Sequence, residues 1–144
     1  MNRYEQGVQK FKEMNGKDSE LVIQRLMSLH PDLARYAMEF AFGDIYNRPL
    51  LDIKSREIAT IAALIALGNS VKQLKVHINC ALNSGVKREE IIEIILQMAV
   101  YAGFAAAINA MQASKEVFDE IDNEKSKVEN GNPSKIQQNR ALSA

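Results

Sequence analysis

The sequence is poor in cysteine and histidine and has no excess of charge of either sign. Its 144 residues include one cysteine, which cannot form a disulfide within the chain and suits a reducing compartment, so we expect a cytoplasmic protein. Because 18 basic and 18 acidic side chains cancel, charge favours neither nucleic acid nor an anionic membrane as a partner. No apolar run approaches the ~20 residues that a membrane-spanning helix needs. We therefore predict no nucleic-acid partner and no membrane partner.

Several motifs that carry chemistry are also missing. The sequence contains no C-x-x-C, no H-E-x-x-H, no nucleophile elbow, no P-loop and no dinucleotide-binding glycine fingerprint. Its two histidines, His30 and His77, are far apart in the sequence, which gives little support for a metal site. We therefore predict neither a metal nor a cofactor.

What the sequence does contain is helical periodicity. It has no alternating polar and apolar run bounded by hairpin turns, so we predict an all-α protein. We expect a single domain, a helical bundle of about six to seven helices over residues 1–129. Residues 42–49 are predicted to form a loop and residues 130–144 a flexible polar tail. The expected helices cover residues 4–15, 19–29, 31–41, 54–67, 71–84, 87–101 and 104–121.

Two consecutive helices, in the stretch 52–85, have the clearest boundaries. Asp52 and Ser70 stand where N-caps are expected, and Gly68 and Gly85 stand where helices end. Between them lie one of the two histidines, the only cysteine and a glutamate inside an apolar helix. We expect any chemistry of the protein to lie in this stretch.

One face of the predicted helix 71–84 is neither core nor surface in character. At roughly 100° per residue, Gln73, His77, Cys80 and Ser84 share a face beside the apolar one. An imidazole beside a thiol can exchange protons near neutral pH. A packed core histidine beside an inert buried cysteine would give the same pattern, so both interpretations stay open. The next arc is predicted to face solvent: Lys72, Lys75, Asn79 and Asn83.

Glu57 is the other unusual residue of this stretch. It lies near the start of the predicted helix 54–67, on the same arc as Ile61 and Ile65. A carboxylate there is favourable in the first turn of a helix, which is a purely structural role. At the edge of a pocket it would instead be suited to acid–base chemistry. The residues alone favour neither role.

The predicted helix 87–101 is apolar on nearly every side. A small domain rarely has enough neighbours to cover such a helix, so we expect a second subunit to cover it and the protein to be a homo-oligomer. Glu93, Gln97 and Tyr101 still form a polar line along it. This line either borders a subunit interface or contributes to a site.

A series of short motifs recurs in order over more than half of the chain. They are P-D-L-A-R at Pro31, F-G-D-I-Y-N-R-P at Phe42, L-D-I-K-S-R-E at Leu51, I-A-A-L-I-A-L-G at Ile61, H-I-N-C-A-L-N-S-G at His77, E-E-I-I-E at Glu89 and Y-A-G-F-A-A-A-I-N-A at Tyr101. In this order and spacing they resemble the carboxymuconolactone decarboxylase family, particularly its γ-carboxymuconolactone decarboxylase branch. The resemblance implies an alkylhydroperoxidase-D-like helical fold with a core over residues 31–121, assembled into a ring as a hexamer or trimer.

The related redox branch carries C-x-x-C-x-x-x-H, and this chain lacks it. When the histidine of that motif is aligned with His77, the two cysteines fall at Ser70 and Gln73. Cys80 lies on the other side of His77 and replaces neither. One thiol cannot close an internal disulfide, so a dithiol relay is excluded and the decarboxylase branch is favoured.

The resemblance implies a carboxy-lyase that removes carbon dioxide from a carboxylated unsaturated lactone without a cofactor. We predict His77 as the proton donor, with Glu57 orienting it or sharing its proton. Arg48 and Arg56 are predicted to grip carboxylates, because guanidinium binds them through two hydrogen bonds. The substrate pocket is predicted to be lined by Gln73, Cys80 and Tyr101.

The chain also departs from the decarboxylase branch. That branch usually has an acidic residue where Gln73 stands, often tryptophan in place of Tyr46, and proline at Phe104–Ala105. These departures leave the identity of the small carboxylate substrate open.

Two alternatives remain at this stage. The first is a thiol-dependent peroxidase that uses Cys80 with an external resolving thiol. The second is a non-catalytic oligomeric protein that keeps the fold without the chemistry. An open pocket of ligand size beside His77 would argue against the second.

Overall fold

The computed structural model describes residues 1–131, and within that range the chain forms helices and contains no strand. The all-α prediction is confirmed. The elements, in chain order, are α1 (Arg3–Asn15), the 3-10 turn η1 (Gly16–Asp18), α2 (Ser19–Leu29), α3 (Pro31–Tyr36), the π-helix η2 (Ala37–Ile45), α4 (Ile53–Leu67), α5 (Val71–Asn83), α6 (Arg88–Ala102) and α7 (Phe104–Asn130).

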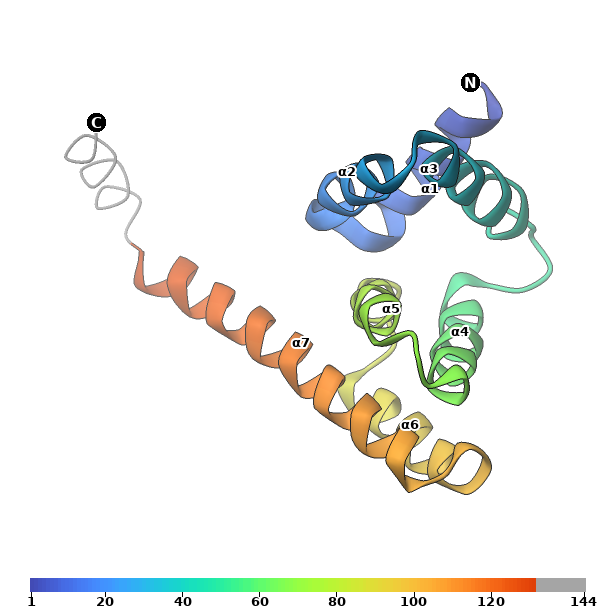
Figure 1. Ribbon diagram of the computed structural model, residues 1–144. Helices are drawn as coiled ribbons and strands as arrows, with labels where there is room; N and C mark the ends of the chain where they lie inside the picture. The colour runs from blue at the N-terminus through green and yellow to red at the C-terminus, as the bar shows by residue number, and fades with distance from the viewer. Residues whose placement is uncertain (132–144) are drawn as a thin grey trace.

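The helices form two groups that meet at α5 (Figure 1). The N-terminal group consists of α1, α2, α3 and η2, and the C-terminal group consists of α4, α5, α6 and α7. A connection over residues 46–52 joins the two groups. Because α5 packs against α1 as well as against α4 and α7, it lies at the boundary between them. The last helix, α7, runs well past the other helices of its group (Figure 1).

Each group has its own apolar core. In the C-terminal group, isoleucines of α4, α5 and α6 pack against small alanines of α7, which allow the helices to approach closely. The N-terminal core includes one residue of α5, Cys80, and thereby ties the two groups together. The buried residues of the C-terminal core are Ile61, Ile65, Leu74, Ile78, Ala81, Val86, Ile91, Ile95, Ala107, Ala110, Ala113 and Val117. Those of the N-terminal core are Phe11, Met14, Ile23, Met38, Phe42 and Cys80.

Two glycines allow α1 and η2 to touch through their backbones. A β-carbon on Gly7 would lie 1.9 Å from the Met38 carbonyl oxygen, and one on Gly43 would lie 2.9 Å from the Arg3 carbonyl oxygen. The predicted loop over residues 42–49 is therefore wrong at its start. Gly43 lies inside η2, which continues to Ile45, because this glycine serves helix contact and does not end the helix.

The close approach at Gly7 predicts that Gly7→Ala destabilises the protein. In a helix this change normally stabilises by about 0.5–1 kcal/mol. Here the new methyl group overlaps backbone atoms that cannot rotate away, and overpacking of this kind costs about 1–3 kcal/mol or more. The midpoint of urea unfolding should therefore fall, whereas Gln6→Ala, at an exposed position of the same helix, should leave it nearly unchanged. An unchanged or higher midpoint for Gly7→Ala would contradict the close contact.

Most of the predicted boundaries of α4 and α5 are confirmed. The Asp52 side chain caps α4 by accepting a hydrogen bond from the Ser55 backbone N–H at 2.7 Å. Gly68 ends α4 in the left-handed region at a φ of 77°, which glycine adopts without strain. Ser70 occupies the N-cap position of α5, but its hydroxyl donates to the Asn69 side chain at 3.1 Å and makes no cap hydrogen bond.

The seventh helix is longer than predicted. It continues past residue 121 to Asn130, and its charged second half forms ion pairs with α6 and with η1. Arg88 of α6 donates to Asp122 at 2.7 Å, and Lys17 pairs with Glu124. The predicted tail at 130–144 thus begins inside α7 at residue 130, and residues 132–144 lie outside the described part of the chain. The single domain over residues 1–129 stays a prediction.

The surface of α6 is only partly covered within one chain. Ile91 and Ile95 are buried, whereas Leu96, Val100 and Tyr101 are 53%, 78% and 78% exposed. One chain thus leaves part of this apolar helix uncovered, and its cover by a second subunit stays a prediction. Within residues 1–131, no helix is both long enough and apolar enough to cross a membrane.

Candidate active site

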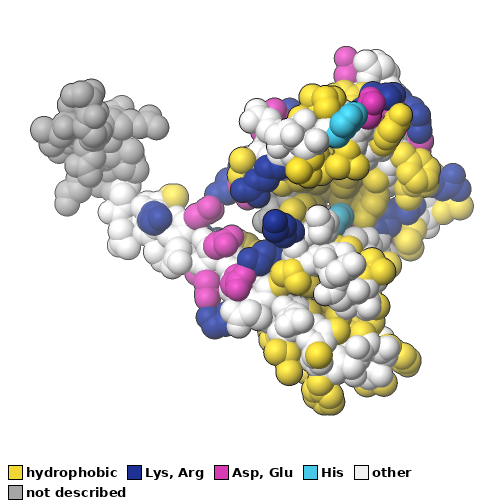
Figure 2. Space-filling view, in the orientation of Figure 1, with side chains coloured by type: hydrophobic (Ala, Val, Ile, Leu, Met, Phe, Trp, Pro, Cys, Tyr) yellow, Lys and Arg dark blue, Asp and Glu magenta, His cyan; other side chains and the backbone are white. Residues whose placement is uncertain are grey.

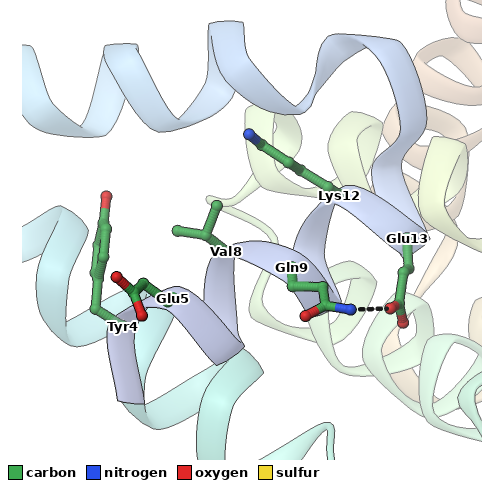
Figure 3. A pocket seen from close by; sticks show the side chains of 6 residues that line it. All are labelled: Tyr4, Glu5, Val8, Gln9, Lys12 and Glu13. Carbon is green, nitrogen blue, oxygen red and sulfur yellow. Dashed lines mark hydrogen bonds between the residues drawn. The ribbon is translucent and has the colours of Figure 1, made fainter. Parts of the chain in front are cut away.

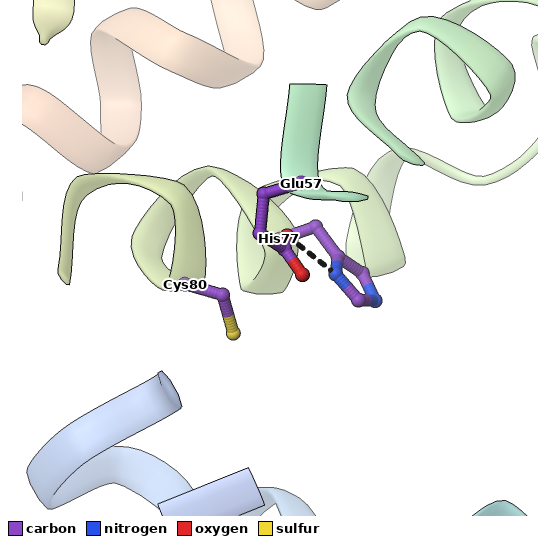
Figure 4. Close-up of side chains that lie close together, drawn as sticks. All are labelled: Glu57, His77 and Cys80. Atoms are coloured by element: carbon purple, nitrogen blue, oxygen red, sulfur yellow. Dashed lines mark hydrogen bonds and ion pairs between the residues drawn. The ribbon is translucent and has the colours of Figure 1, made fainter. Parts of the chain in front are cut away.

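The centre of the candidate site is a contact between α4 and α5. The Nδ1 atom of His77 and the Oε2 atom of Glu57 are 2.9 Å apart (Figure 4). The Glu57 side chain is completely buried, and the His77 side chain is 17% exposed. The second ring nitrogen of His77 is directed away from Glu57 (Figure 4). The pair therefore consists of an inaccessible carboxylate and a partly exposed imidazole.

Glu57 carries an unmet hydrogen-bonding capacity. Its Oε1 atom is buried and has no hydrogen-bond partner among the described residues. Burying a polar atom without a partner is unfavourable, and burying a charge is more so. A catalytic role is one of the explanations for an unsatisfied buried group, and a bound water or ion is another. The acid–base role of Glu57 stays a prediction.

Cys80 lies next to this pair and is fully buried. Its Sγ atom is 3.5 Å from the Oδ1 atom of Asn15, to which the thiol donates. Burial, and in second place the negative charge of Glu57, raise the pKa of the Cys80 thiol far above its ordinary value. Since the thiolate is the nucleophile of cysteine chemistry, this thiol is poorly suited to attack a peroxide.

Three side chains of the site are of kinds that bind metals. The donor atoms of Glu57, His77 and Cys80 all lie within 4.8 Å of one another. A metal would bind Cys80 as the thiolate, and in the absence of a metal, burial raises the pKa of this thiol. The hydrogen bond between Glu57 and His77 also allows proton transfer between these two side chains.

The polar face of α5 was predicted to be solvated; Asn83 is exposed, whereas Asn79 is half-buried, and both asparagines hydrogen-bond to α1. The Asn79 amide donates to the Asn15 backbone and side-chain oxygens at 3.1 and 2.9 Å. The Asn83 amide donates to the Met14 carbonyl at 3.0 Å. These bonds bind the last turn of α1 to α5. Asn15 thereby contacts both Asn79 and Cys80, a link that no local sequence pattern reveals.

The other predicted site residues do not hydrogen-bond to the Glu57–His77 pair within the described part of the chain. Arg48 is exposed, and Arg56 donates to the Leu51 and Arg48 carbonyl oxygens at 3.0 and 3.2 Å. Gln73 is exposed one turn before His77 on α5. Tyr101 is 78% exposed at the end of α6. Their predicted roles depend on a bound substrate or a neighbouring subunit and stay predictions.

Tyr46 and Thr60 belong to the site, although the sequence did not assign them to it. The Tyr46 hydroxyl lies 2.7 Å from Thr60 Oγ1, and Thr60 follows Glu57 by one helical turn on α4. Burial, and next the charge of Glu57, raise the pKa of Tyr46 to about 12. The i, i+3 spacing of Glu57 and Thr60 was visible in the sequence, but the contact with Tyr46 depends on the fold.

The surface of the molecule is indented between the two groups of helices, the boundary at which α5 lies (Figure 2). On the face seen in Figure 2, hydrophobic side chains lie on the margin of the N-terminal group. A separate open depression of about 570 Å³ lies on α1 (Figure 3) and contains none of the candidate site residues. It is lined by Tyr4, Glu5, Val8, Gln9, Lys12 and Glu13.

Comparison with known proteins shows which family and relatives the chain resembles. Residues 31–116 match the model of the carboxymuconolactone decarboxylase family. A 4-carboxymuconolactone decarboxylase of Acinetobacter baylyi is 34% identical over 120 residues, which cover 83% of this chain and 89% of that protein. An uncharacterised 15.0 kDa protein of Paracoccus denitrificans is 32% identical over 71% of this chain and 77% of its own length. A nitrosuccinic acid decarboxylase of Metarhizium robertsii is 34% identical over 58% of this chain and 57% of its own length.

Proposed function

Because the chain belongs to the carboxymuconolactone decarboxylase family, we propose that it is a carboxy-lyase that acts on a small carboxylated substrate. The preferred substrate is a carboxylated unsaturated lactone of the 4-carboxymuconolactone type, and the product is the enol-lactone with carbon dioxide. The observation that carries the proposal is the buried Glu57 hydrogen-bonded to the partly exposed His77. We propose that this pair performs the proton transfer of the reaction without a cofactor.

The reaction needs a proton donor at one face of the substrate. Breaking the bond to the carboxyl group releases carbon dioxide and leaves an electron pair, which spreads into the conjugated lactone. A proton from the exposed nitrogen of His77 then neutralises that charge on carbon, and solvent returns the proton to the imidazole. Glu57, bonded to Nδ1, fixes the ring orientation and stabilises the protonated imidazole.

The remaining predicted residues would bind the substrate. We propose that Arg48 and Arg56 attract its carboxylate groups, since both lie on or beside the connection that leads into α4. Gln73 is one turn from His77 on α5 and would border the same space. Cys80 would contribute a neutral wall, and Tyr101 would reach the site only from another subunit.

The two relatives with named reactions support chemistry of this class. In both named substrates, loss of a carboxyl group leaves an electron pair beside an acceptor, a conjugated lactone in one relative and a nitro group in the other. A donor that protonates such a stabilised carbanion serves both.

The purified protein should release carbon dioxide from 4-carboxymuconolactone, measured together with the absorbance change of the lactone. Nitrosuccinic acid forms the second arm of the experiment and distinguishes a lactone substrate from an open-chain acid. Consumption of neither compound would overturn the proposal.

We also propose that the protein is a homo-oligomer in the cytoplasm, as a hexameric or trimeric ring. The support is a group of apolar side chains around the turn from α6 to α7. Leu96, Val100, Phe104 and Ile108 are each more than half exposed there, and monomeric proteins rarely expose such a group. Light scattering on the purified protein measures the number of subunits, and a monomer would exclude the ring.

The state of Cys80 separates this proposal from a thiol-dependent peroxidase. Because the thiol is buried and its pKa is raised, iodoacetamide should alkylate it about 10²-fold more slowly in the native protein than in urea. Mass spectrometry of the chain at successive times measures both rates, and the single cysteine makes the assignment unambiguous. Native alkylation as fast as in urea, with consumption of peroxide that Cys80→Ser abolishes, would favour the peroxidase.

A further inference from the structure

Tyr46 connects the N-terminal group of helices to the Glu57 side of α4. It follows η2, and its ring packs against Phe42 with the ring centroids 5.2 Å apart. Its hydroxyl reaches Thr60 Oγ1 at 2.7 Å. Since Glu57 and Thr60 are one turn apart on α4, they project from the same side of the helix. The phenol oxygen is thus held beside the buried carboxylate.

The contact between the Tyr46 and Thr60 hydroxyls leaves one hydroxyl hydrogen available for another acceptor. Tyr46 and Thr60 each carry one hydroxyl proton, and only one proton can occupy the space between their oxygens. When Thr60 donates, the proton of Tyr46 is free for another acceptor. The nearby Oε1 atom of Glu57 is buried and has no partner among residues 1–131.

The electrostatics of Tyr46 agree with a contact to Glu57. Burial raises the pKa of Tyr46 to about 12, with further contributions from the charge of Glu57 and from Glu57 as a hydrogen-bond acceptor. The phenol therefore keeps its proton at any pH at which the protein works. It is a permanent donor that can turn between Thr60 and Glu57 by rotation about its C–O bond.

We propose that Tyr46 is a positioning residue of the decarboxylase, whose hydroxyl donates to Glu57 while Glu57 is ionised and turns to Thr60 when Glu57 takes up a proton from His77. This inference rests on the proposed function. Besides the proton that His77 gives to the substrate and regains from solvent, the only proton that moves is the one between Glu57 and His77, and the phenol retains its own throughout. Tyr46 would thus keep the buried carboxylate ionised and ready to hold the protonated imidazole.

Few other titratable groups face this arrangement. α5 contributes His77 and Cys80, and Cys80 stays protonated. On α4 the Arg56 guanidinium carbon lies 6.0 Å from the Tyr46 ring centroid and is bonded to backbone carbonyls. From α1, Tyr4 packs against the same apolar cluster as Tyr46. The hydroxyl of Tyr46 is therefore the neutral donor best situated to respond to the charge of Glu57.

The test is Tyr46→Phe, which removes the hydroxyl and keeps the ring that packs on Phe42. We expect kcat to fall about tenfold, with KM changed by less than about twofold, because a hydrogen bond to a charged group is lost at the reacting pair. The acid limb of the kcat profile should move to higher pH by about 0.5 to 1 unit, since an anion without its donor takes up a proton more readily.

Two variants serve as controls. Tyr36→Phe removes a hydroxyl from a tyrosine that is 57% exposed on α3 and should leave kcat and the pH profile unchanged. Thr60→Val leaves Tyr46 with Glu57 as its remaining acceptor, so the acid limb should stay or move to lower pH, opposite to Tyr46→Phe. An active Tyr46→Phe protein with the kcat and pH profile of the wild type would overturn the proposal.

A measurement that needs no substrate tests the role of Tyr46 independently of the proposed decarboxylase function. The NMR titration of the His77 ring protons follows the coupled pair directly, and His30→Ala identifies which of the two histidine signals is His77. The acid inflection of that signal should move to higher pH in Tyr46→Phe even if 4-carboxymuconolactone is not a substrate. An unmoved inflection would overturn the role of Tyr46, whatever the protein decarboxylates.

Discussion

Replacing His77 by alanine is expected to lower kcat for decarboxylation by about 10²- to 10⁴-fold, the usual contribution of a positioned proton donor. His77 is the group of the Glu57–His77 pair that reaches the surface, with an exposed fraction of 17%, so the substrate must meet the proton there. The binding of the substrate depends on other residues, and KM should therefore change much less than kcat. Steady-state kinetics with 4-carboxymuconolactone measure both quantities.

Alanine at position 77 also leaves Glu57 buried without its partner, so a loss of activity from misfolding must be distinguished from a loss of the proton donor. His77→Asn makes this distinction, because its amide nitrogen lies near the position of Nδ1 and still donates to Glu57, yet it cannot exchange a proton. This variant should keep the circular dichroism spectrum and melting temperature of the wild type and lose activity to the same extent as His77→Ala.

The other histidine provides the matched control. His30 is exposed at the start of α3, where its Nδ1 accepts the Asp32 backbone N–H at 3.2 Å. His30→Ala removes this cap and an imidazole that lies away from the Glu57–His77 pair. The decarboxylation activity should therefore stay within about twofold of the wild type. If His77→Asn folds and retains the activity of the wild type, His77 is not the proton donor.

The local features of α4 and α5 were predictable because they depend on neighbouring residues alone. The Asp52 side chain caps α4 by accepting the backbone N–H of the residue three positions later. Gly68 ends the same helix because glycine adopts a positive φ without strain. The face that contains His77 and Cys80 follows from helical periodicity in the same way. The contact of His77 with Glu57 is different in kind, since it joins two helices, and the two residues were paired from their chemistry together with the family resemblance.

The features that the sequence did not reveal depend on contacts between distant parts of the chain. Asn15 looked like an ordinary helix end, and it bonds to Asn79 and Cys80 of α5. Gly43 was placed in a predicted loop, and it instead lies inside η2, where it allows close contact with α1. A glycine that forms a turn and a glycine that allows two helices to pack closely look the same in the sequence. Only the contact with the neighbouring helix distinguishes them.

The burial of the Glu57 carboxylate lowers stability, whereas the proposed activity requires this carboxylate. A carboxylate that is fully buried, bonded through one oxygen and unpartnered at the other among the described residues, opposes folding. Its partner His77 is partly exposed and can be neutral, so removing the carboxylate leaves no unpaired buried charge. Proteins retain such groups where activity requires them, at the expense of stability.

Glu57→Met should therefore abolish decarboxylation and leave the protein at least as stable as before. Methionine fills nearly the same volume without a charge, and removing one partner of a buried pair is strongly destabilising only when it leaves a buried unpaired charge, which the partly exposed His77 is not. The free energy of unfolding in urea should stay within about 1 kcal/mol of the wild type or rise, while kcat falls by about 10²-fold or more.

A glutamate at the surface shows what the same substitution does without burial. Glu120 is exposed on α7, and Glu120→Met should change the free energy of unfolding by less than about 0.5 kcal/mol and leave activity intact. If Glu57→Met instead unfolds the protein or costs several kcal/mol, the carboxylate is part of what holds α4 and α5 together. If it folds and remains active, His77 acts without Glu57. Only a stable and inactive Glu57→Met protein fits a carboxylate that is kept for its chemistry.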